Sequence, residues 1–326
     1  MARPFAALLG ACGLLVAACG GAAAQPAVNW PTKPIRAIMP IAPGTGADVV
    51  FRLVFHELSN RLGQQIVIEN RGGAGGTIGS AAAAKADPDG YTILAQSTSH
   101  TIAPALYPNM SYDVTRDFIA VVPFGKMPTA LIISPGKGIK TVQQLVAEAK
   151  AKPGAFTFAS AGVGSTTHLT MERFLLSAGI TAIHVPFRGG GFRPEVASGR
   201  VDFAFSPIAV AIPDVRDGRL LALAVSARER ASGFPDVPTT LEAGFPNSDY
   251  ALWLGIFVPA NTPRAIVDRL HDESLKALQS PALRDRLAGL DVEPMVMTTA
   301  EFDAFIRDEV VLQGALARAA GLKPGQ

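Results

Sequence analysis

The fold class is decided by the stretch IRAIMPIAPGTGADVVFRLVFHELSNRL, residues 35–62. Its apolar start predicts a strand from Ile35 to Ile41, which Pro43 and the following glycine close. Apolar side chains at helical spacing then begin at Val50 and predict a helix that buries one face. A second strand, an Ala-rich helix and a third strand at 91–95 follow. This βαβαβ order is typical of a parallel sheet covered by helices.

A second α/β unit of the same build follows the first. It begins within a two-strand stretch at 120–134 and alternates between strands and helices up to Ser226. An apolar stretch at 250–258 and a helical tail then return to the first unit. We therefore expect an α/β protein of two lobes, each a mainly parallel sheet flanked by helices, whose strand-to-helix loops face a shared cleft. The expected lobes are residues 27–125 plus 251–326, and residues 126–250.

The first 24 residues indicate an export signal. Arg3 precedes an apolar run up to Ala18, and small residues continue to Ala24. The run has about 15 residues, fewer than the roughly 20 that span a bilayer. We expect cleavage after Ala24 and a periplasmic protein; the alternative is a lipoprotein-type site with a lipid anchor on Cys19. Cys12 and Cys19 are the only cysteines, so the cleaved chain has no disulfide and no thiol nucleophile.

Charge and composition exclude several classes of protein. The 29 basic and 27 acidic residues leave a formal charge of +2, too balanced for a nucleic-acid-binding protein. Hydrophobic residues make up 48% of the chain and charged residues 17%, which excludes a disordered chain. The five histidines are scattered without the paired spacing of metal ligands. We expect no nucleic-acid partner, no metal and no other cofactor.

Two strand-to-helix turns carry the candidate binding residues. They read PIAPGTGAD at 40–48 and SAGVGSTTH at 160–168, and both place glycines before a helix. Glycine lets the backbone approach a ligand, and the first N–H groups of a helix attract anions. Neither turn contains Lys or Arg, so neutral amides and hydroxyls would hold a carboxylate. The alternative is a pair of ordinary turns in which Ser165 and Thr166 cap a helix.

Further motifs accompany these two turns along the chain. In order, the motifs are PIAPGTGAD (40–48), ENRGGAGG (69–76), PDGY (88–91), GVGSTTHL (162–169), VPFRG (185–189), PDVPT (235–239), WLG (253–255) and PANTP (259–263). Together they resemble the periplasmic substrate-binding proteins of tripartite tricarboxylate transporters, the Bug-type family, over nearly all of the chain after the leader. Ile41 stands where that family has Phe, and Phe187-Arg188 where it has Tyr-Lys.

The resemblance implies the periplasmic-binding-protein (Venus flytrap) architecture and a hinge-closing protein without chemistry of its own. Such a protein captures a small organic acid and presents it to an inner-membrane tripartite permease; we expect a monomer. By position, the resemblance implies ligand contacts from Gly44, Thr45, Gly46, Ala47, Asp48, Gly162, Val163, Gly164, Ser165, Thr166 and His168. Further candidates are Ile41, Ser97, Ser99, Phe187 and Arg188, the last as a partner for a second carboxylate.

Two other functions stay open at this point. The turn at 73–79 places glycines between a strand and a helix, which is the pattern of a nucleotide-dependent oxidoreductase. The expected fold would equally suit a sensor that docks, ligand-loaded, on a membrane signalling partner. Three residues also have alternative roles. Asp48 either satisfies the start of its helix or contacts the ligand, and Ser165 with His168 indicates capping rather than hydrolysis, because no Gly-x-Ser-x-Gly elbow is present.

Overall fold

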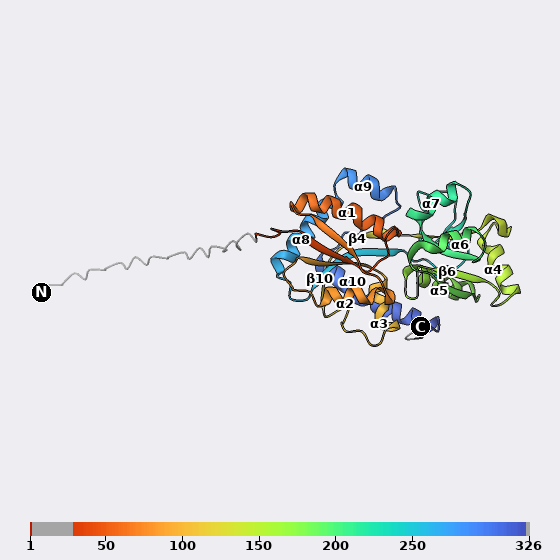
Figure 1. Ribbon diagram of the computed structural model, residues 1–326, viewed down its shortest axis with the longest axis horizontal. Helices are drawn as coiled ribbons and strands as arrows, with labels where there is room; N and C mark the ends of the chain where they lie inside the picture. Colours follow the sequence, from red (N-terminus) through yellow and green to blue (C-terminus); the bar gives the residue numbers. More distant parts are fainter. Residues whose placement is uncertain (2–28, 324–326) are drawn as a thin grey trace.

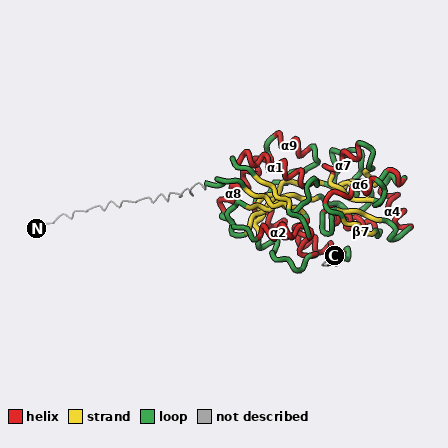
Figure 2. Tube along the Cα trace, in the orientation of Figure 1, coloured by secondary structure: helices red, strands yellow, loops and turns green. Residues whose placement is uncertain are grey.

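The computed structural model describes residue 1 and residues 29–323 (Figure 1). Two lobes lie side by side, each with a five-stranded sheet between layers of helices (Figures 1 and 2). Residues 2–28, which contain the expected cleavage sites and both cysteines, lie outside the described part. Within the described part, no helix combines the length and the apolar character needed to cross a membrane.

The sheet of the first lobe has the strand order β2-β1-β3-β10-β4. Its strands are β1 (Ile35–Met39), β2 (Ile66–Asn70), β3 (Thr92–Ser97), β4 (Phe118–Met127) and β10 (Leu252–Pro259). β1 pairs in parallel with β2 and β3, which confirms the predicted βαβαβ unit. β10 is antiparallel to both β3 and β4. Four strands therefore share one direction, and the strand that returns from the second lobe opposes them.

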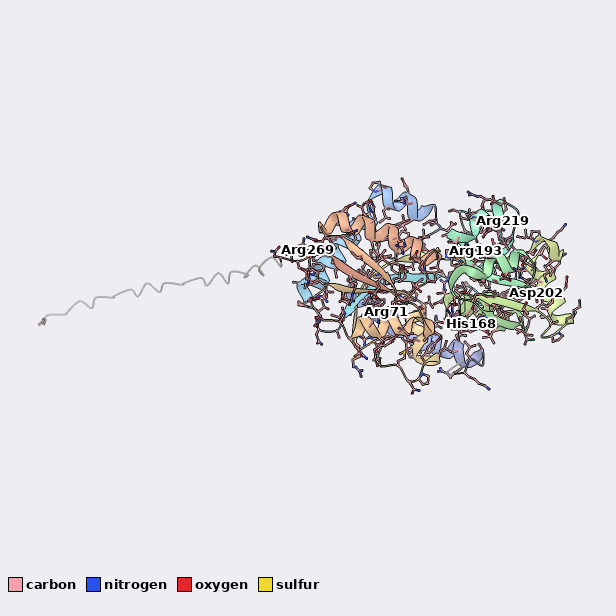
Figure 3. The ribbon with its side chains drawn as sticks, in the orientation of Figure 1. Arg71, His168, Arg193, Asp202, Arg219 and Arg269 are labelled. Atoms are coloured by element: carbon pink, nitrogen blue, oxygen red, sulfur yellow. The ribbon has the colours of Figure 1, made fainter. Side chains whose placement is uncertain are left out.

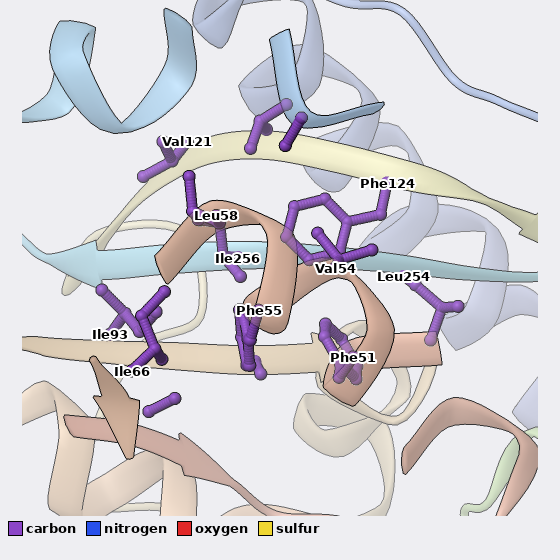
Figure 4. Close-up of a cluster of buried hydrophobic side chains, with 14 of the residues drawn as sticks. Phe51, Val54, Phe55, Leu58, Ile66, Ile93, Val121, Phe124, Leu254 and Ile256 are labelled. Carbon is purple, nitrogen blue, oxygen red and sulfur yellow. The ribbon is translucent and has the colours of Figure 1, made fainter. Parts of the chain in front are cut away.

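Helices cover both faces of this sheet. They are α1 (Gly46–Leu62), α2 (Thr77–Ala84), α3 (Ser99–Leu106), α8 (Arg264–Leu278), α9 (Pro281–Ala288) and α10 (Thr299–Ala319), with the short 3-10 helix η1 (Ala74–Gly76) before α2. The predicted apolar stripe of α1 packs Phe51 and Phe55 against Phe124 of β4, with the two contacts 5.7 and 6.1 Å between ring centroids (Figure 4). Burying such a side chain stabilises the fold by roughly 1.5–3 kcal/mol.

The second lobe repeats the arrangement of the first, with the strand order β7-β6-β8-β5-β9. Its strands are β5 (Thr129–Ile133), β6 (Thr157–Ser160), β7 (Ile183–Pro186), β8 (Phe203–Pro207) and β9 (Leu221–Val225). Its helices are α4 (Val142–Ala151), α5 (Thr166–Ala178), α6 (Arg193–Ala197) and α7 (Ile208–Arg216), with η2 (Pro135–Lys137) and η3 (Gly189–Phe192). β6 is parallel to β7 and β8, and β5 is antiparallel to β8 and β9.

Two chain crossings connect the lobes. β4 runs almost directly into β5, and the return crossing passes through Tyr250 before β10. The buried Tyr250 hydroxyl lies 3.0 Å from Thr98 Oγ1 and 3.1 Å from Glu309 Oε2. The indole of Trp253 donates to the same carboxylate, 3.2 Å away. The return crossing is thereby tied to α10 and to the start of α3.

Candidate functional site

A cavity of about 780 Å³ lies between the lobes, at the carboxyl ends of the strands where open α/β sheets bind ligands. Its walls come from the loops after β1, β2 and β3 in one lobe and after β6, β7 and β8 in the other. The predicted residues that line it are Ile41, Thr45, Gly46, Ala47, Ser97, Ser99, Gly162, Val163, Ser165, Thr166, Phe187 and Arg188. Gly44, Asp48, Gly164 and His168 are not among the lining residues.

Asp48 supports the first loop from behind instead of facing the cavity. The carboxylate is only 3% exposed, and it accepts hydrogen bonds from the Gly44 N–H (2.9 Å), Arg52 Nε (2.9 Å) and Asn70 Nδ2 (3.1 Å). Burial alone would raise the pKa of this carboxyl, but the three donors and the Arg52 charge together hold the pKa below its usual value. Thr45 caps α1 by accepting from the Asp48 N–H, so the loop is held at both of its ends.

His168 supports the second loop in a similar way. Its Nδ1 accepts from the Gly164 N–H at 3.2 Å, and its ring stacks on His184 with the centroids 4.0 Å apart. The Ser165 hydroxyl caps α5 by accepting from the backbone N–H of His168. Ser165 therefore meets the main chain of His168 rather than its imidazole, which agrees with capping and not with a nucleophile and its base.

His184 completes a stack of three rings behind this loop. Its ring stacks with those of both His168 and Phe158, and its Nε2 is 2.7 Å from Ser160 Oγ. Burial, and secondarily the nearby His168, lower the pKa of His184 to about 3. His184 therefore stays uncharged at neutral pH.

Several residues that line the cavity were not predicted from the sequence as ligand contacts. The glycine-rich turn at 72–76 lines the cavity, although the pattern at 73–79 only left open the alternative of a dinucleotide turn, and Tyr107 lines the cavity beside it. Ser206, Pro207 and Val210 line it from the second lobe. Ser206 ends an ordinary apolar strand without a motif, so only the packing of β8 and α7 brings it to the cavity.

The electrostatics of the wall favour an anion. Among the described residues, no Asp, Glu, Lys or His lines the cavity, whereas Arg188 and Arg193 do. Arg193 Nε pairs with Asp214 at 3.0 Å, but Arg188 has no ion pair with any residue between 29 and 323. Helices α1, α2, α3, α5 and α7 all begin at the wall, and the start of a helix carries partial positive charge. Figure 3 shows Arg193 and His168 on the side of the second lobe that faces the first.

Glycines mark the places where the lobes touch. A Cβ on Gly46 would lie 2.7 Å from the Cβ of Pro207, and a Cβ on Gly189 would lie 2.5 Å from that of Ala42. In each pair one residue belongs to each lobe, so only glycine permits this approach. The two lobes therefore touch each other beside the cavity.

No group of three or more His, Cys, Asp or Glu side chains within residues 29–323 is arranged to hold a metal ion. The nearest approach of histidines described above, His168 with His184, is a stack of ring faces, and ring faces do not ligate metals.

Comparison with known proteins agrees with this fold. Residues 50–322 match the model of the family described as "Tripartite tricarboxylate transporter family receptor". BugT of Bordetella pertussis is 34% identical over 321 residues, which cover 97% of this chain and 98% of BugT. The two-lobed α/β architecture also occurs in solved periplasmic binding proteins, so the expected fold is confirmed.

Two solved relatives contain a bound acid. Rpa4515 of R. palustris, solved with adipate, has a TM-score of 0.86 and 28% identity, covering 91% of this chain and all of its own. MatC from Rhodopseudomonas palustris, solved with malate, has a TM-score of 0.82 and 30% identity, covering 88% of this chain and 99% of its own. With the family model matching most of its length, this chain belongs to the receptor family of the tripartite tricarboxylate transporters.

Proposed function

We propose that the protein is an extracytoplasmic solute-binding protein that captures a small organic carboxylate between its lobes and delivers it to a tripartite tricarboxylate-type membrane transporter. The observation that carries this proposal is the cavity wall, which presents five helix starts and two arginines and, among the described residues, no acidic side chain. Such a wall attracts a negatively charged ligand. The acids in the two solved relatives, adipate and malate, belong to the proposed class.

Closure is the proposed mechanism of capture. The moving bodies are residues 27–125 plus 251–326 and residues 126–250, and they hinge at the two chain crossings. A carboxylate held by the loop at 45–47 and the loop at 162–166 contacts both lobes only when they are closed. The ligand therefore stabilises the closed state by binding it more tightly than the open one.

The affinity needs more than the helix starts. One helix start stabilises an anion by about 0.3–2 kcal/mol, whereas micromolar binding requires about −8.2 kcal/mol. A charge-assisted hydrogen bond from Arg188, which has no ion pair within the described part of the chain, adds about 1.5–3 kcal/mol. Asp48 and His168 serve in this mechanism as supports of the two loops, through the contacts described above.

The family is one of substrate-binding receptors, and we infer that this member catalyses no reaction and works as a periplasmic monomer. Residues 1–24 would be removed on export. Mass spectrometry of the exported protein tests where the chain is cleaved. A chain that begins at Gln25 would support the free periplasmic form, whereas a lipidated Cys19 would show that the protein is anchored to the membrane.

A thermal-shift screen tests the proposed function. Protein refolded to remove carried-over ligand is screened against mono-, di- and tricarboxylates, aromatic acids and amino acids. Ligand at 100 times its dissociation constant stabilises the folded state by about 2.7 kcal/mol. Arg188→Ala should reduce the shift, whereas Arg216→Ala removes the same charge from the same lobe away from the cavity and should not. A folded protein that responds to no acid would refute the proposal.

A further inference from the structure

Tyr250 joins the two lobes at the return crossing. Its main chain is bound to the second lobe, because its N–H donates to Ser226 O at 3.0 Å and its carbonyl accepts from Ser226 Oγ at 2.7 Å. Its phenol is bound to the first lobe, where Thr98 Oγ1, Glu309 Oε2 and Gln313 Nε2 lie 3.0, 3.1 and 2.8 Å from the hydroxyl oxygen. One rigid ring therefore spans the hinge, with each end held by a different lobe.

The carboxylate that receives the phenol is buried without a cation against it. Glu309 is 8% exposed, and its Oε2 accepts from the phenol, from the Trp253 indole and from Gln313 Nε2. Within residues 29–323, this carboxylate forms no ion pair. Burial, and secondarily the Glu309 charge, raise the pKa of Tyr250 well above its usual value, so the phenol keeps its proton and donates. A buried carboxylate in such a place depends on every donor that reaches it.

The second lobe contributes a cation to the same ring. The guanidinium of Arg173, on α5, lies over the Tyr250 ring, 4.9 Å from the ring centroid. Its Nε is buried without a hydrogen-bond partner, and the guanidinium forms no ion pair within the described part of the chain. A cation over an aromatic face is attracted to the ring, most strongly where water is excluded. Arg173 is therefore tied to this ring, and through the ring to Glu309 of the first lobe.

One face of α5 is turned to the first lobe. Thr166 lines the cavity, and Leu169 packs in one apolar cluster with Ala317 of α10. Arg173 follows one turn later, and the spacing of three and four residues puts all three side chains on one face of the helix. Because α5 carries both the end of the ligand loop and Arg173, a movement that brings the loop to the ligand also brings Arg173 to Tyr250.

The contacts of the ring in the first lobe adjoin the cavity wall. Thr98 is fully buried and stands between Ser97 and Ser99, which both line the cavity. Arg173 and Tyr250 do not line it. A substitution at either of these two residues therefore removes no group from the cavity wall.

We infer that Arg173, Tyr250 and Glu309 form a latch across the hinge, which sets how long a bound acid is retained without touching it. The inference rests on the proposed function, because it takes closure of the lobes to be the step that retains the acid. Since the ring is attached to both lobes, opening pulls it either from Thr98 and Glu309 or from Arg173. The latch acts on the closed state alone, so it slows release and leaves the rate of capture unchanged.

Tyr250→Phe tests the latch, because it removes the phenol hydroxyl and keeps the ring. The probe is whichever of adipate, malate, citrate and benzoate gives the largest thermal shift. Affinity is measured by calorimetry, and capture and release by stopped-flow tryptophan fluorescence, with the refolded mature protein. We expect the variant to release the acid about 10-fold faster and to bind it about 10-fold more weakly, equivalent to about 1.4 kcal/mol, with an unchanged rate of capture.

Tyr91→Phe is the matched control. The Tyr91 hydroxyl also has hydrogen-bond partners, the N–H and Oγ1 of Thr32 at 2.9 and 3.1 Å, but these belong to the same lobe as Tyr91. Tyr91 does not line the cavity either. Both variants should lower the free energy of unfolding in urea, because each loses hydrogen bonds, and only Tyr250→Phe should speed release. A merely structural role of Tyr250 would lower the stability and leave the rate of release as in the wild type.

Arg173→Met tests the other attachment and keeps the latch testable if Tyr250→Phe does not fold. Methionine keeps most of the length of the side chain but loses its charge, so release should become about 3-fold faster. The double variant should release the acid no faster than Tyr250→Phe alone, because the two contacts act in series.

The outcomes separate the latch from the proposed function. Release rates that both single variants leave unchanged would overturn the latch while the proposed function stands. Fully additive effects in the double variant would overturn the series of contacts through the ring. A wild type that binds none of the four acids would overturn both the latch and the proposed function.

Discussion

Gly46→Ala should block closure of the lobes without unfolding either of them. The new methyl group would lie 2.7 Å from the Pro207 Cβ and 3.1 Å from the Met127 Cε, whereas ordinary contact begins at 3.4 Å. The lobes must therefore separate by about 0.7 Å at this point, and overpacking of this kind costs about 1–3 kcal/mol. Because the clash with Pro207 exists only when the lobes are closed, its cost appears as weaker ligand binding, about 5- to 150-fold at 1.4 kcal/mol per decade.

The unliganded variant should be at least as stable as the wild type, because alanine favours a helix more than glycine does and Gly46 is the first residue of α1. The assay is calorimetric titration with the acid that gives the largest thermal shift, together with small-angle scattering with and without this acid. We expect the wild type to become more compact with ligand and the variant to respond less.

Gly191→Ala is the control for this substitution. Gly191 is exposed, its backbone needs no positive φ, and a Cβ there would meet no atom within 4 Å. A double-mutant cycle with Pro207→Gly separates the clash between lobes from a clash with the ligand, because removing the Pro207 Cβ should restore affinity only in the first case. Wild-type affinity in Gly46→Ala would refute the closed arrangement as the state that binds.

Three further predictions concern the supports of the loops. Ser165 caps α5 and Ser280 caps α9, each by accepting a hydrogen bond from a backbone N–H. Replacing either serine by alanine should lower the free energy of unfolding, measured in urea, by about 1 kcal/mol. Only Ser165→Ala should also weaken ligand binding, because Ser280 does not line the cavity. Asp48→Ala should lower the free energy of unfolding by about 2 kcal/mol, because Gly44, Arg52 and Asn70 all lose their acceptor, and an unchanged urea midpoint would contradict this support role. Burial lowers the pKa of His100 to about 4 and that of His184 to about 3, from 6.5 in the unfolded chain, so stability is complete above pH 6.5 and falls as the pH decreases. Each histidine contributes up to about 1.4 kcal/mol per pH unit, and His184→Phe should make the fall between pH 7 and 5 shallower.

Most of the fold could be predicted because strands buried on both faces are nearly continuous apolar runs, and the helices between them keep their apolar spacing. The apolar spacing at 142–151, for example, predicts a helix, and α4 has those bounds. Helix α3 was not predicted, because it contains Pro104 and buries His100, Thr101, Ile102, Ala103 and Leu106, so no polar face alternates with an apolar one. The order of the strands in the sequence could not show that β10 and β5 run antiparallel to their neighbours. The direction of these two strands depends on the path that the chain takes through the crossings.

The site was predictable to the extent that it follows a motif. The two glycine-rich turns line the cavity as their pattern indicated, but the same motifs also contain residues that do not line the cavity. Asp48 and His168 stand inside these motifs but do not line the cavity, and their partners Arg52 and Glu172 do not line it either. Ser206 is the opposite case, a residue without a motif that reaches the cavity because β8 ends beside the start of α7.

The interleaved strands also set the order in which the chain can fold. β10 lies between β3 and β4, yet it is made only after the whole second lobe, more than a hundred residues later than β4. Until residues 252–259 emerge, β3 and β4 have no strand to bridge them, and the first sheet exists only as β1, β2 and β3 with the β3 edge unpaired. The second lobe has no such gap, since β5 precedes its neighbours in the chain. The lobe that begins first is therefore completed last, and a nascent chain interrupted before β10 would present an unpaired strand edge that a chaperone must cover.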